Sequence, residues 1–382
     1  MINNSWYYII SVYYIMSNTK KMSQQITKKA HTSKTRSPIR SNMKFSLFTT
    51  STLKIIKTKD QESNTISSID YKMVFLDPNT SMFIKNLKEI RQNIKRMSNN
   101  IKYEIKEIKI PVNKLNELKN SVWVSPELVL DNLDYEVKIS WNNNNLYFKT
   151  TKEKFNKIKK RLPILIKMMN YIKLQSKQQT QITIYYVLSD LKKHIEENTV
   201  ISPKHINSGY TDLLTKEIFI WRSEEFEKIS FHELIHLFYQ DHTNESVSLQ
   251  VKINGPKSFY EAVTDLKGII YNIIYISLVM NIKIEKILKN ELFFINNQAK
   301  MVLSHLNSTN CTQKSPAYSY FILKEKIFNY FTSEFADEKL FNDIFYKNIN
   351  FNKLIQIIKN EKIHNDDFID FNSARMTLYE CE

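Results

Sequence analysis

The sequence contains very little glycine, with only Gly209, Gly255 and Gly268 among 382 residues. Phosphate-binding loops of the dinucleotide-binding and P-loop kinds need several glycines in close order, because the phosphates approach the backbone. Neither G-x-G-x-x-G nor G-x-x-x-x-G-K-S/T occurs in the chain. The sequence therefore excludes nucleotide binding through either motif.

Cysteine is also scarce, since the chain has two, Cys311 and Cys381. Two cysteines cannot build a disulfide framework or an all-cysteine zinc site. We therefore expect an intracellular protein, made in a reducing compartment and not secreted. Hydrophobic residues make up 42% of the chain and aromatic residues 12%. This length and composition suit two domains of ordinary size, or one large domain with an extra segment.

Acidic residues are missing from the N-terminal part of the chain. Residues 17–59 contain 11 Lys or Arg and no Asp or Glu, within a net charge of +16 for the whole chain. The segment is rich in Ser and Thr and shows little hydrophobic periodicity, so we expect residues 1–68 to form a disordered basic tail. This composition agrees with two interpretations of the tail. It could contact nucleic acid or an acidic partner, or it could be a solvated leader without a partner.

The apolar run at residues 6–16 is too short to cross a bilayer, which takes about 20 residues. A secretory signal would carry positive charge before the run and a small-residue cleavage site after it, and neither is present. We expect no membrane span here. A hydrophobic anchor and an extension upstream of a later start, at Met16, Met22 or Met43, both remain open.

Hydrophobic periodicity predicts a mixed helix and strand domain at residues 69–175 and a second domain at residues 176–382. The expected strands are 71–76, 101–110, 135–141, 146–150, 181–188 and 218–221, and the expected helices are 81–97, 152–174 and 190–197. Asn142–Asn145 should form the turn of a hairpin, and Pro163 should kink or split the helix at 152–174.

The motif His232-Glu233-Leu-Ile-His236 carries the chemistry of the second domain. On a helix, histidines four residues apart project from one face about one turn apart, so both can bind one Zn²⁺. Glu233 lies beside them, where a carboxylate can reach a metal-bound water. Ser223 is expected to cap this helix, with two glutamates in its first turn. Two packing or capping histidines are the alternative interpretation.

A catalytic zinc site needs a third protein ligand and an open position, and the sequence offers two candidates. His242 has the spacing of the metzincins, although Tyr239 stands where that pattern has a glycine. Glu261 begins a Glu-Ala-Val-Thr-Asp sequence in a helix expected to start near Pro256, where a buried carboxylate needs a metal or hydrogen bonds. Asp265, on the same face, can accept a hydrogen bond from a ligand histidine.

These residues resemble the gluzincins, the thermolysin-like metallopeptidases, in which a ligand glutamate in an E-A-x-x-D context follows H-E-x-x-H. The resemblance covers roughly residues 205–268. It implies that His232, His236 and Glu261 bind zinc, that Glu233 is the general base, and that Asp265 bonds a ligand histidine. It implies an α+β protein whose mainly helical zincin-like domain has a small mixed or antiparallel sheet, following the mixed N-terminal domain.

The stretch before the 218–221 strand also resembles the edge strand on which these enzymes bind an extended polypeptide substrate. The resemblance gives Asn207, Ser208 and Gly209 as substrate-binding residues. Together with the Lys-, Asn- and Ile-rich composition, the same block resembles metallopeptidases of large DNA viruses, which implies the host cytoplasm or the virion as location.

Such an enzyme needs a donor for the oxyanion of the tetrahedral intermediate, and the candidates are His305, Tyr318 and Tyr320. The sequence thus predicts a hydrolase, a zinc-dependent endopeptidase whose water is activated by zinc and Glu233. The alternative from another class is a non-enzymatic binding protein, such as a virion structural protein. Its basic tail would hold it to nucleic acid or to a partner.

Overall fold

The computed structural model describes residues 80–98, 101–239, 253–333, 335–347, 350–358 and 373–379. These residues belong to one compact unit of the chain, Met43–Glu382. The basic tail, the expected strand at 71–76 and His242 lie outside the described residues.

Six strands form one mixed sheet in the order β1-β2-β3-β4-β6-β5. The strands are β1 (Glu104–Glu107), β2 (Tyr135–Trp141), β3 (Asn144–Thr150), β4 (Thr183–Ser189), β5 (Gly209–Asp212) and β6 (Glu217–Arg222). β1, β2 and β3 are antiparallel neighbours, β4 is parallel to both β3 and β6, and β5 pairs antiparallel with β6. The expected α+β class and the mixed character of the sheet are confirmed, but the sheet was expected within residues 176–382 and three of its six strands, β1 to β3, come from residues 104–150.

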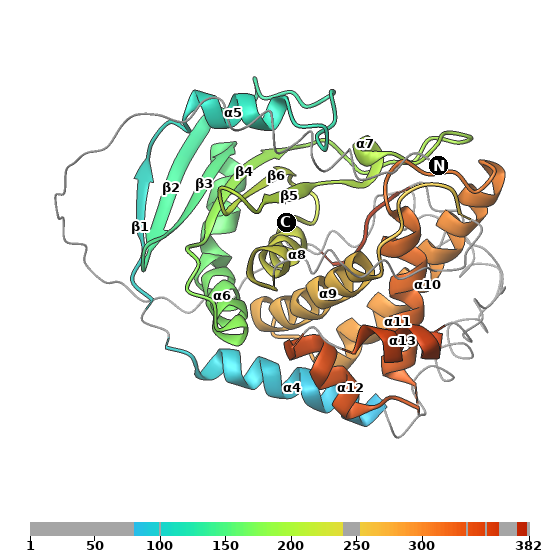
Figure 1. Cartoon of the computed structure of the whole chain (residues 1–382). Helices are drawn as coiled ribbons and strands as arrows, with labels where there is room; N and C mark the ends of the chain where they lie inside the picture. The colour runs from blue at the N-terminus through green and yellow to red at the C-terminus, as the bar shows by residue number, and fades with distance from the viewer. Residues whose placement is uncertain are drawn as a thin grey trace, which may run out of the picture. The chain divides into compact units, whose positions relative to one another are not determined.

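Helices make up most of the remaining described structure (Figure 1). They are α4 (Thr80–Arg96), α5 (Val112–Lys119), α6 (Lys152–Ser176), α7 (Pro203–Ile206), α8 (Phe226–Tyr239), α9 (Phe259–Val279), α10 (Ile284–Ser308), α11 (Lys324–Thr332), α12 (Glu338–Asn342) and α13 (Phe351–Ile358), with two π-helical segments, η2 (Tyr318–Leu323) and η3 (Asp343–Lys347).

Several local predictions are confirmed. The hairpin of β2 and β3 turns at Asn142 and Asn143, which adopt φ of 43° and 65°, a region that asparagine tolerates better than most residues. The helix predicted at 152–174 is α6. It runs without interruption through Pro163, so the expectation that Pro163 could split the helix is wrong. α6 also supplies the crossover that parallel pairing of β3 and β4 requires.

The two faces of the sheet pack against different layers (Figure 1). Near α5, one face carries a ladder of stacked rings across four strands, with centroid spacings of 4.8 to 5.0 Å. The rings belong to Tyr147, Tyr185, Phe219 and Tyr210. α6 contacts β3, and α8 contacts β5 and β6, in the main hydrophobic core. The sheet therefore fixes the position of α8 from one side.

Helix α9 crosses the centre of the main core and contacts α8, α6, α10 and α11. By length and composition it could span a membrane, but 89% of its apolar window is buried inside the protein. An apolar helix that is buried all round is the expected centre of a large helical core. α9 is therefore explained as a core helix.

The expected helix at 190–197 is wrong, because residues in this stretch bond to other parts of the chain. Lys193 N–H donates to the Glu224 carboxylate at 2.8 Å, and the Lys193 carbonyl accepts from Ala374 N–H at 3.3 Å. His194 also forms a bridge with Ser373. These partners lie 31 residues or more away in sequence, so local periodicity could not show them.

Ser223 is not the N-cap of α8, which begins at Phe226. Ser223 N–H donates instead to the Ser189 carbonyl at 2.8 Å. Glu225 adopts the left-handed region, with φ of 60°, so neither Glu224 nor Glu225 belongs to the first turn as expected. The sheet and its neighbouring helices take residues from both sides of position 175, and the division into domains there stays a prediction.

Candidate metal centre

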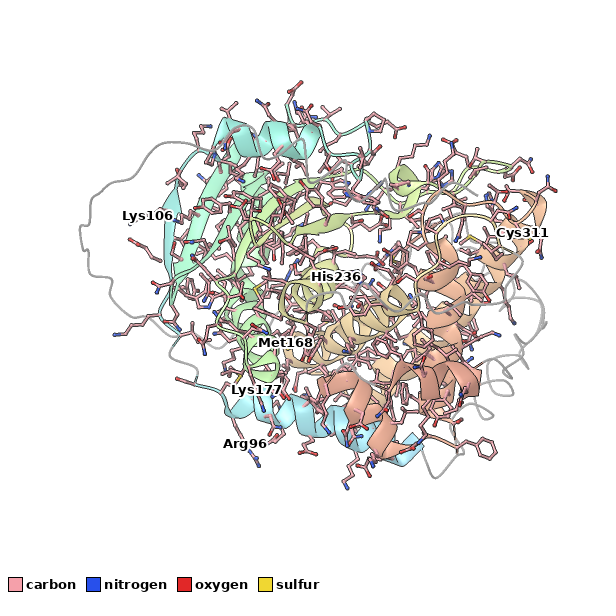
Figure 2. All side chains as sticks on the ribbon, in the orientation of Figure 1. Arg96, Lys106, Met168, Lys177, His236 and Cys311 are labelled. Carbon is pink, nitrogen blue, oxygen red and sulfur yellow. The ribbon has the colours of Figure 1, made fainter. Side chains whose placement is uncertain are left out.

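The two motif histidines project from α8 toward the first turn of α9. His232 is 5% exposed and His236 is 8% exposed, and Figure 2 shows His236 in the interior, between the sheet and the helices around α9. The Nε2 atoms of the two rings are 3.0 Å apart. Each Nε2 lies 3.5 Å from Oε2 of Glu261. The three predicted ligands therefore converge, as a group that could hold a metal ion.

These spacings agree with a single small ion. Tetrahedral Zn²⁺ with bonds of about 2.0–2.2 Å separates its ligand atoms by roughly 3.3–3.5 Å. The observed distances of 3.0 and 3.5 Å are close to that value. Two nitrogens and one carboxylate oxygen also match the donor set of catalytic zinc sites. The residues present thus fit zinc.

Glu261 lies nearer the start of its helix than the sequence suggested. α9 begins at Phe259 rather than near Pro256, and the Ser258 hydroxyl caps it by accepting from Glu261 N–H at 3.1 Å. Burial raises the pKa of Glu261, but the charge of His236 and hydrogen bonds with both rings outweigh it and hold the pKa well below the ordinary value. The positive end of the helix dipole also favours a carboxylate here. Glu261 is therefore ionised at neutral pH, as a metal ligand must be.

Asp265 lies one turn further along α9 and contacts the other side of His232. Its Oδ1 is 3.2 Å from His232 Nδ1, which leaves Nε2 free to face the metal position. Lys228 also donates to Oδ1, and Lys324 donates to Oδ2 at 2.8 Å. Burial raises the pKa of Asp265, but the two lysines outweigh it, so the pKa lies well below the ordinary value. Asp265 is a charged acceptor that fixes the orientation of His232.

Glu233 points toward the edge strand β5 rather than toward α9. The Thr211 hydroxyl lies 2.8 Å from Glu233 Oε2 and 3.0 Å from the Glu233 carbonyl. A Cβ added to Gly209 would come within 2.7 Å of Ile229 Cγ2 and 3.2 Å of Glu233 Oε1. The glycine thus permits β5 to approach α8 at the general-base candidate.

Among the three oxyanion candidates, Tyr320 is the one that contacts two of the predicted ligands, Glu261 and His232. Its hydroxyl donates to Glu261 Oε2 at 3.1 Å, and its ring centroid is 6.0 Å from that of His232. Burial and the charge of Glu261 raise its pKa well above the ordinary value, so it remains a proton donor. Tyr318 is buried and its N–H donates to Gln313, whereas His305 bonds the Thr199 carbonyl at 2.6 Å.

The predicted substrate-binding residues lie at the start of β5. Trp221 N–H donates to the Ser208 carbonyl, so alternation directs the backbone groups of Gly209 and Thr211 away from β6. Within the described residues, β5 has a strand neighbour on that one side only. The Asn207 carbonyl accepts from Arg222 at 3.0 Å, and its side chain accepts from Ser315 at 3.3 Å. Asn207 therefore fixes the turn, while the backbone groups of Gly209 and Thr211 point away from β6.

Three helical stretches each contribute residues four apart. α8 presents Lys228, His232 and His236, α9 presents Glu261 and Asp265, and the η2–α11 stretch presents Tyr320 and Lys324. Sequence reasoning missed Thr211, Lys228 and Lys324 as residues of this site. The two lysines do show a signal, because each stands four residues from a site residue in an apolar helix. His242, the metzincin alternative, lies outside the described residues.

Comparison with known proteins gives no further guide to the function. No family model matches the chain, and no curated protein and no solved structure does so.

Proposed function

We propose that the chain is a zinc-dependent endopeptidase of the gluzincin type. The observation that carries this proposal is the convergence of two Nε2 atoms and one carboxylate oxygen within 3.0 to 3.5 Å, with Glu233 bonded to the edge strand β5. A purely structural zinc site would close the coordination with a fourth protein ligand. Among the described residues, three groups form the cluster.

His232, His236 and Glu261 would hold the zinc ion. When bound, Zn²⁺ polarises a scissile carbonyl and lowers the pKa of a coordinated water toward about 7. The rest of the chemistry belongs to side chains and backbone of this chain.

Glu233 is the group that moves the proton. It accepts a proton from the attacking water and delivers it to the leaving amine. The Thr211 hydroxyl, 2.8 Å from Oε2, orients one carboxylate oxygen and leaves Oε1 for the water. Glu233 is 5% exposed, so few bulk waters compete with this transfer.

Tyr320 supplies a hydrogen-bond donor for the oxyanion. In the structure its hydroxyl bonds Glu261 Oε2, next to the position between the three ligands. Rotation toward a substrate would move that donor to the developing negative charge, where such a bond contributes about 3 kcal/mol. The raised pKa of Tyr320 keeps its proton available.

The free edge of β5 supplies the binding surface for the substrate. A peptide in extended conformation can add to this edge through the backbone groups of Gly209 and Thr211. Main-chain pairing binds any polypeptide of this shape, so it defines a substrate class rather than a sequence. The same strand holds Glu233 through Thr211, which places the general base beside a bound backbone.

Zinc analysis and peptide hydrolysis by the purified full chain test the proposal together. We expect one zinc per chain in the wild type and in Glu233→Gln, and hydrolysis of a denatured protein substrate by the wild type. Glu233→Gln should lower kcat by about 10²–10⁴-fold, because it removes proton transfer and keeps the ligands.

Glu261→Ala and His242→Ala form a matched pair for the third ligand. We expect Glu261→Ala to lose zinc and His242→Ala to keep it. The reverse result would select the metzincin alternative. A wild type without stoichiometric zinc would contradict the enzyme proposal and favour a binding or structural protein.

A further inference from the structure

The segment Ser373–Tyr379 near the end of the chain lies inside the protein. Ala374 and Thr377 are fully buried, and Met376 is 4% exposed. The segment has no helix of its own, so its backbone groups need partners from elsewhere. The identity of those partners indicates the role of the segment.

Two buried carboxylates bind its N–H groups. Glu225 Oε1 accepts from Met376 N–H at 2.7 Å and from Thr377 N–H at 2.6 Å. Glu291 accepts from Leu378 N–H at 3.1 Å. Glu225 reaches this position from a left-handed backbone with φ of 60°, which is a strained conformation for a non-glycine residue. The site for the segment is therefore built at a cost in backbone energy.

Further contacts hold the segment to the helices around the metal centre. Asn272 on α9 donates to the Thr377 hydroxyl and to the Tyr379 carbonyl, both at 3.2 Å. Gln298 on α10 donates to the Ser373 carbonyl at 3.0 Å. The segment thus joins the loop after β4, the start of α8, α9 and α10.

Met376 occupies the point where the segment meets the metal centre. Lys228 Nζ lies 3.5 Å from Met376 Sδ, and Lys324 Nζ lies 3.4 Å from the Met376 carbonyl. Side-chain exposure of these lysines is 0% and 1%. Each ammonium carries three hydrogens that need acceptors in a dry environment. Met376 supplies one acceptor to each ammonium group, beside the oxygen that Asp265 supplies to each.

We infer that Met376, Lys228 and Lys324 form a positioning device for the metal ligand His232. The segment holds the two ammonium groups, the ammonium groups hold both oxygens of Asp265, and Asp265 holds His232 Nδ1. Loss of one contact in this series allows the next side chain to rotate. His232 then no longer presents Nε2 in one fixed direction. The inference rests on the metal site of the proposed function and is independent of peptide hydrolysis.

The test measures zinc affinity in the full-length protein by competition with a chelator of known affinity. We expect Lys324→Met to weaken zinc binding by about 10-fold or more, as loss of groups behind a metal ligand does. Met376→Ala removes the sulfur contact to Lys228 but keeps the backbone carbonyl that Lys324 contacts, so we expect a smaller loss of affinity in the same direction. Lys324→Arg keeps the charge and a donor, and should restore most of the affinity. Tyr379→Phe removes the bond from Asn290 at 2.6 Å in the same segment, away from the lysines, and should leave zinc affinity unchanged.

A second readout separates positioning from loss of stability. Long-range ¹H–¹⁵N spectra of the zinc-loaded protein report which nitrogen of His232 carries the proton. We expect a single Nδ1-protonated form in the wild type and in Tyr379→Phe, and a mixture in Lys324→Met and Met376→Ala. A segment with a structural role alone would lower the melting temperature in all three variants without altering this signal.

The outcomes separate this inference from the proposed function. A wild type that binds no zinc overturns both. A wild type that binds zinc, with folded Lys324→Met and Met376→Ala variants that bind it equally well, overturns the inference alone. If Lys324→Met does not fold, the zinc affinity and the His232 protonation signal of Met376→Ala decide instead. Met376→Ala removes no buried charge, so we expect it to fold.

Discussion

Thr211 has one hydroxyl hydrogen and two acceptors on Glu233 within reach, the carboxylate at 2.8 Å and the carbonyl at 3.0 Å. Replacement by valine keeps the shape and removes the donor. We expect Thr211→Val to lower kcat by about 10-fold, because Glu233 is no longer held in one orientation for proton transfer. Zinc content should not change. Steady-state peptide hydrolysis together with metal analysis measures both.

Thr211→Ser is the matched control, since it keeps the hydroxyl and should retain most of the activity. Equal kcat values for Thr211→Val and the wild type would show that the hydroxyl does not orient the base.

Glu291 gives the fold a stability that depends on pH. Burial raises its pKa to about 7, although hydrogen bonds from Thr377 and Leu378 and the charge of Lys324 oppose this, while Glu225 adds to it. The unfolded chain has a glutamate pKa of about 4.3. Between these values the folded state binds more protons, so the contribution of Glu291 to stability falls as pH rises from about 4.3 to 7.

Glu291→Gln keeps a carbonyl acceptor for the segment and does not titrate. We expect its free energy of unfolding to equal that of the wild type near pH 4 and to exceed it by about 3 kcal/mol at pH 8. Urea denaturation at both pH values measures the difference in unfolding free energy between the variant and the wild type. Other groups titrate equally in both proteins, so their effect cancels in this difference. A difference that does not vary with pH would refute the raised pKa.

At the scale of elements, the approach of β5 to α8 is the contact that brings together the proposed substrate surface and the proposed general base. A Cβ on Gly209 would meet Ile229 Cγ2 at 2.7 Å, which is too close for any real contact. We expect Gly209→Ala to lower kcat/KM by about 10-fold or more and to cost about 1–3 kcal/mol of stability. Zinc binding should persist, since the ligands lie on α8 and α9. Peptide hydrolysis and denaturation measure the two effects.

Ile229→Ala offers a compensating change for that variant. The double variant Gly209→Ala/Ile229→Ala removes the clash and should recover part of the lost kcat/KM. No recovery, in a folded double variant, would mean that the glycine serves another purpose.

The success of prediction from sequence differed between elements for a physical reason. Local patterns predicted α6, the β2–β3 hairpin and the ligand pair on α8, because each depends on contacts within a few residues. The residues at 190–197 and the start of α8 depend on Glu225 and Ser373–Tyr379, which are about 150 residues apart. Glu261 could be found because its context repeats a known pattern, whereas Thr211 could not, because its contact with Glu233 arises from the pairing of β5.

At the scale of the whole molecule, zinc would join α8 to α9. The ligands come from both helices, so only the folded chain presents them together. A ligand that binds the native state alone at 100 times its Kd adds about 2.7 kcal/mol to stability. We expect removal of zinc by a chelator to lower the melting temperature of the wild type, and readdition to restore it. Circular dichroism measures the transition.

Glu261→Ala provides the control for this effect. Its melting temperature should not respond to zinc or chelator, because it lacks the third ligand. An equal zinc response in wild type and Glu261→Ala would place the stabilising ion elsewhere on the chain.

The apolar character of α9 affects how this protein unfolds as well as how it folds. Before the core forms, the chain exposes a segment of 21 residues as apolar as a membrane span, and such exposed segments associate with one another. Unfolding at high temperature should therefore be followed by aggregation rather than by a return to the native state. The resistance of the protein to heat is then measured as the half-life of its native state at a given temperature. Metal binding should lengthen it by slowing the separation of α9 from α8.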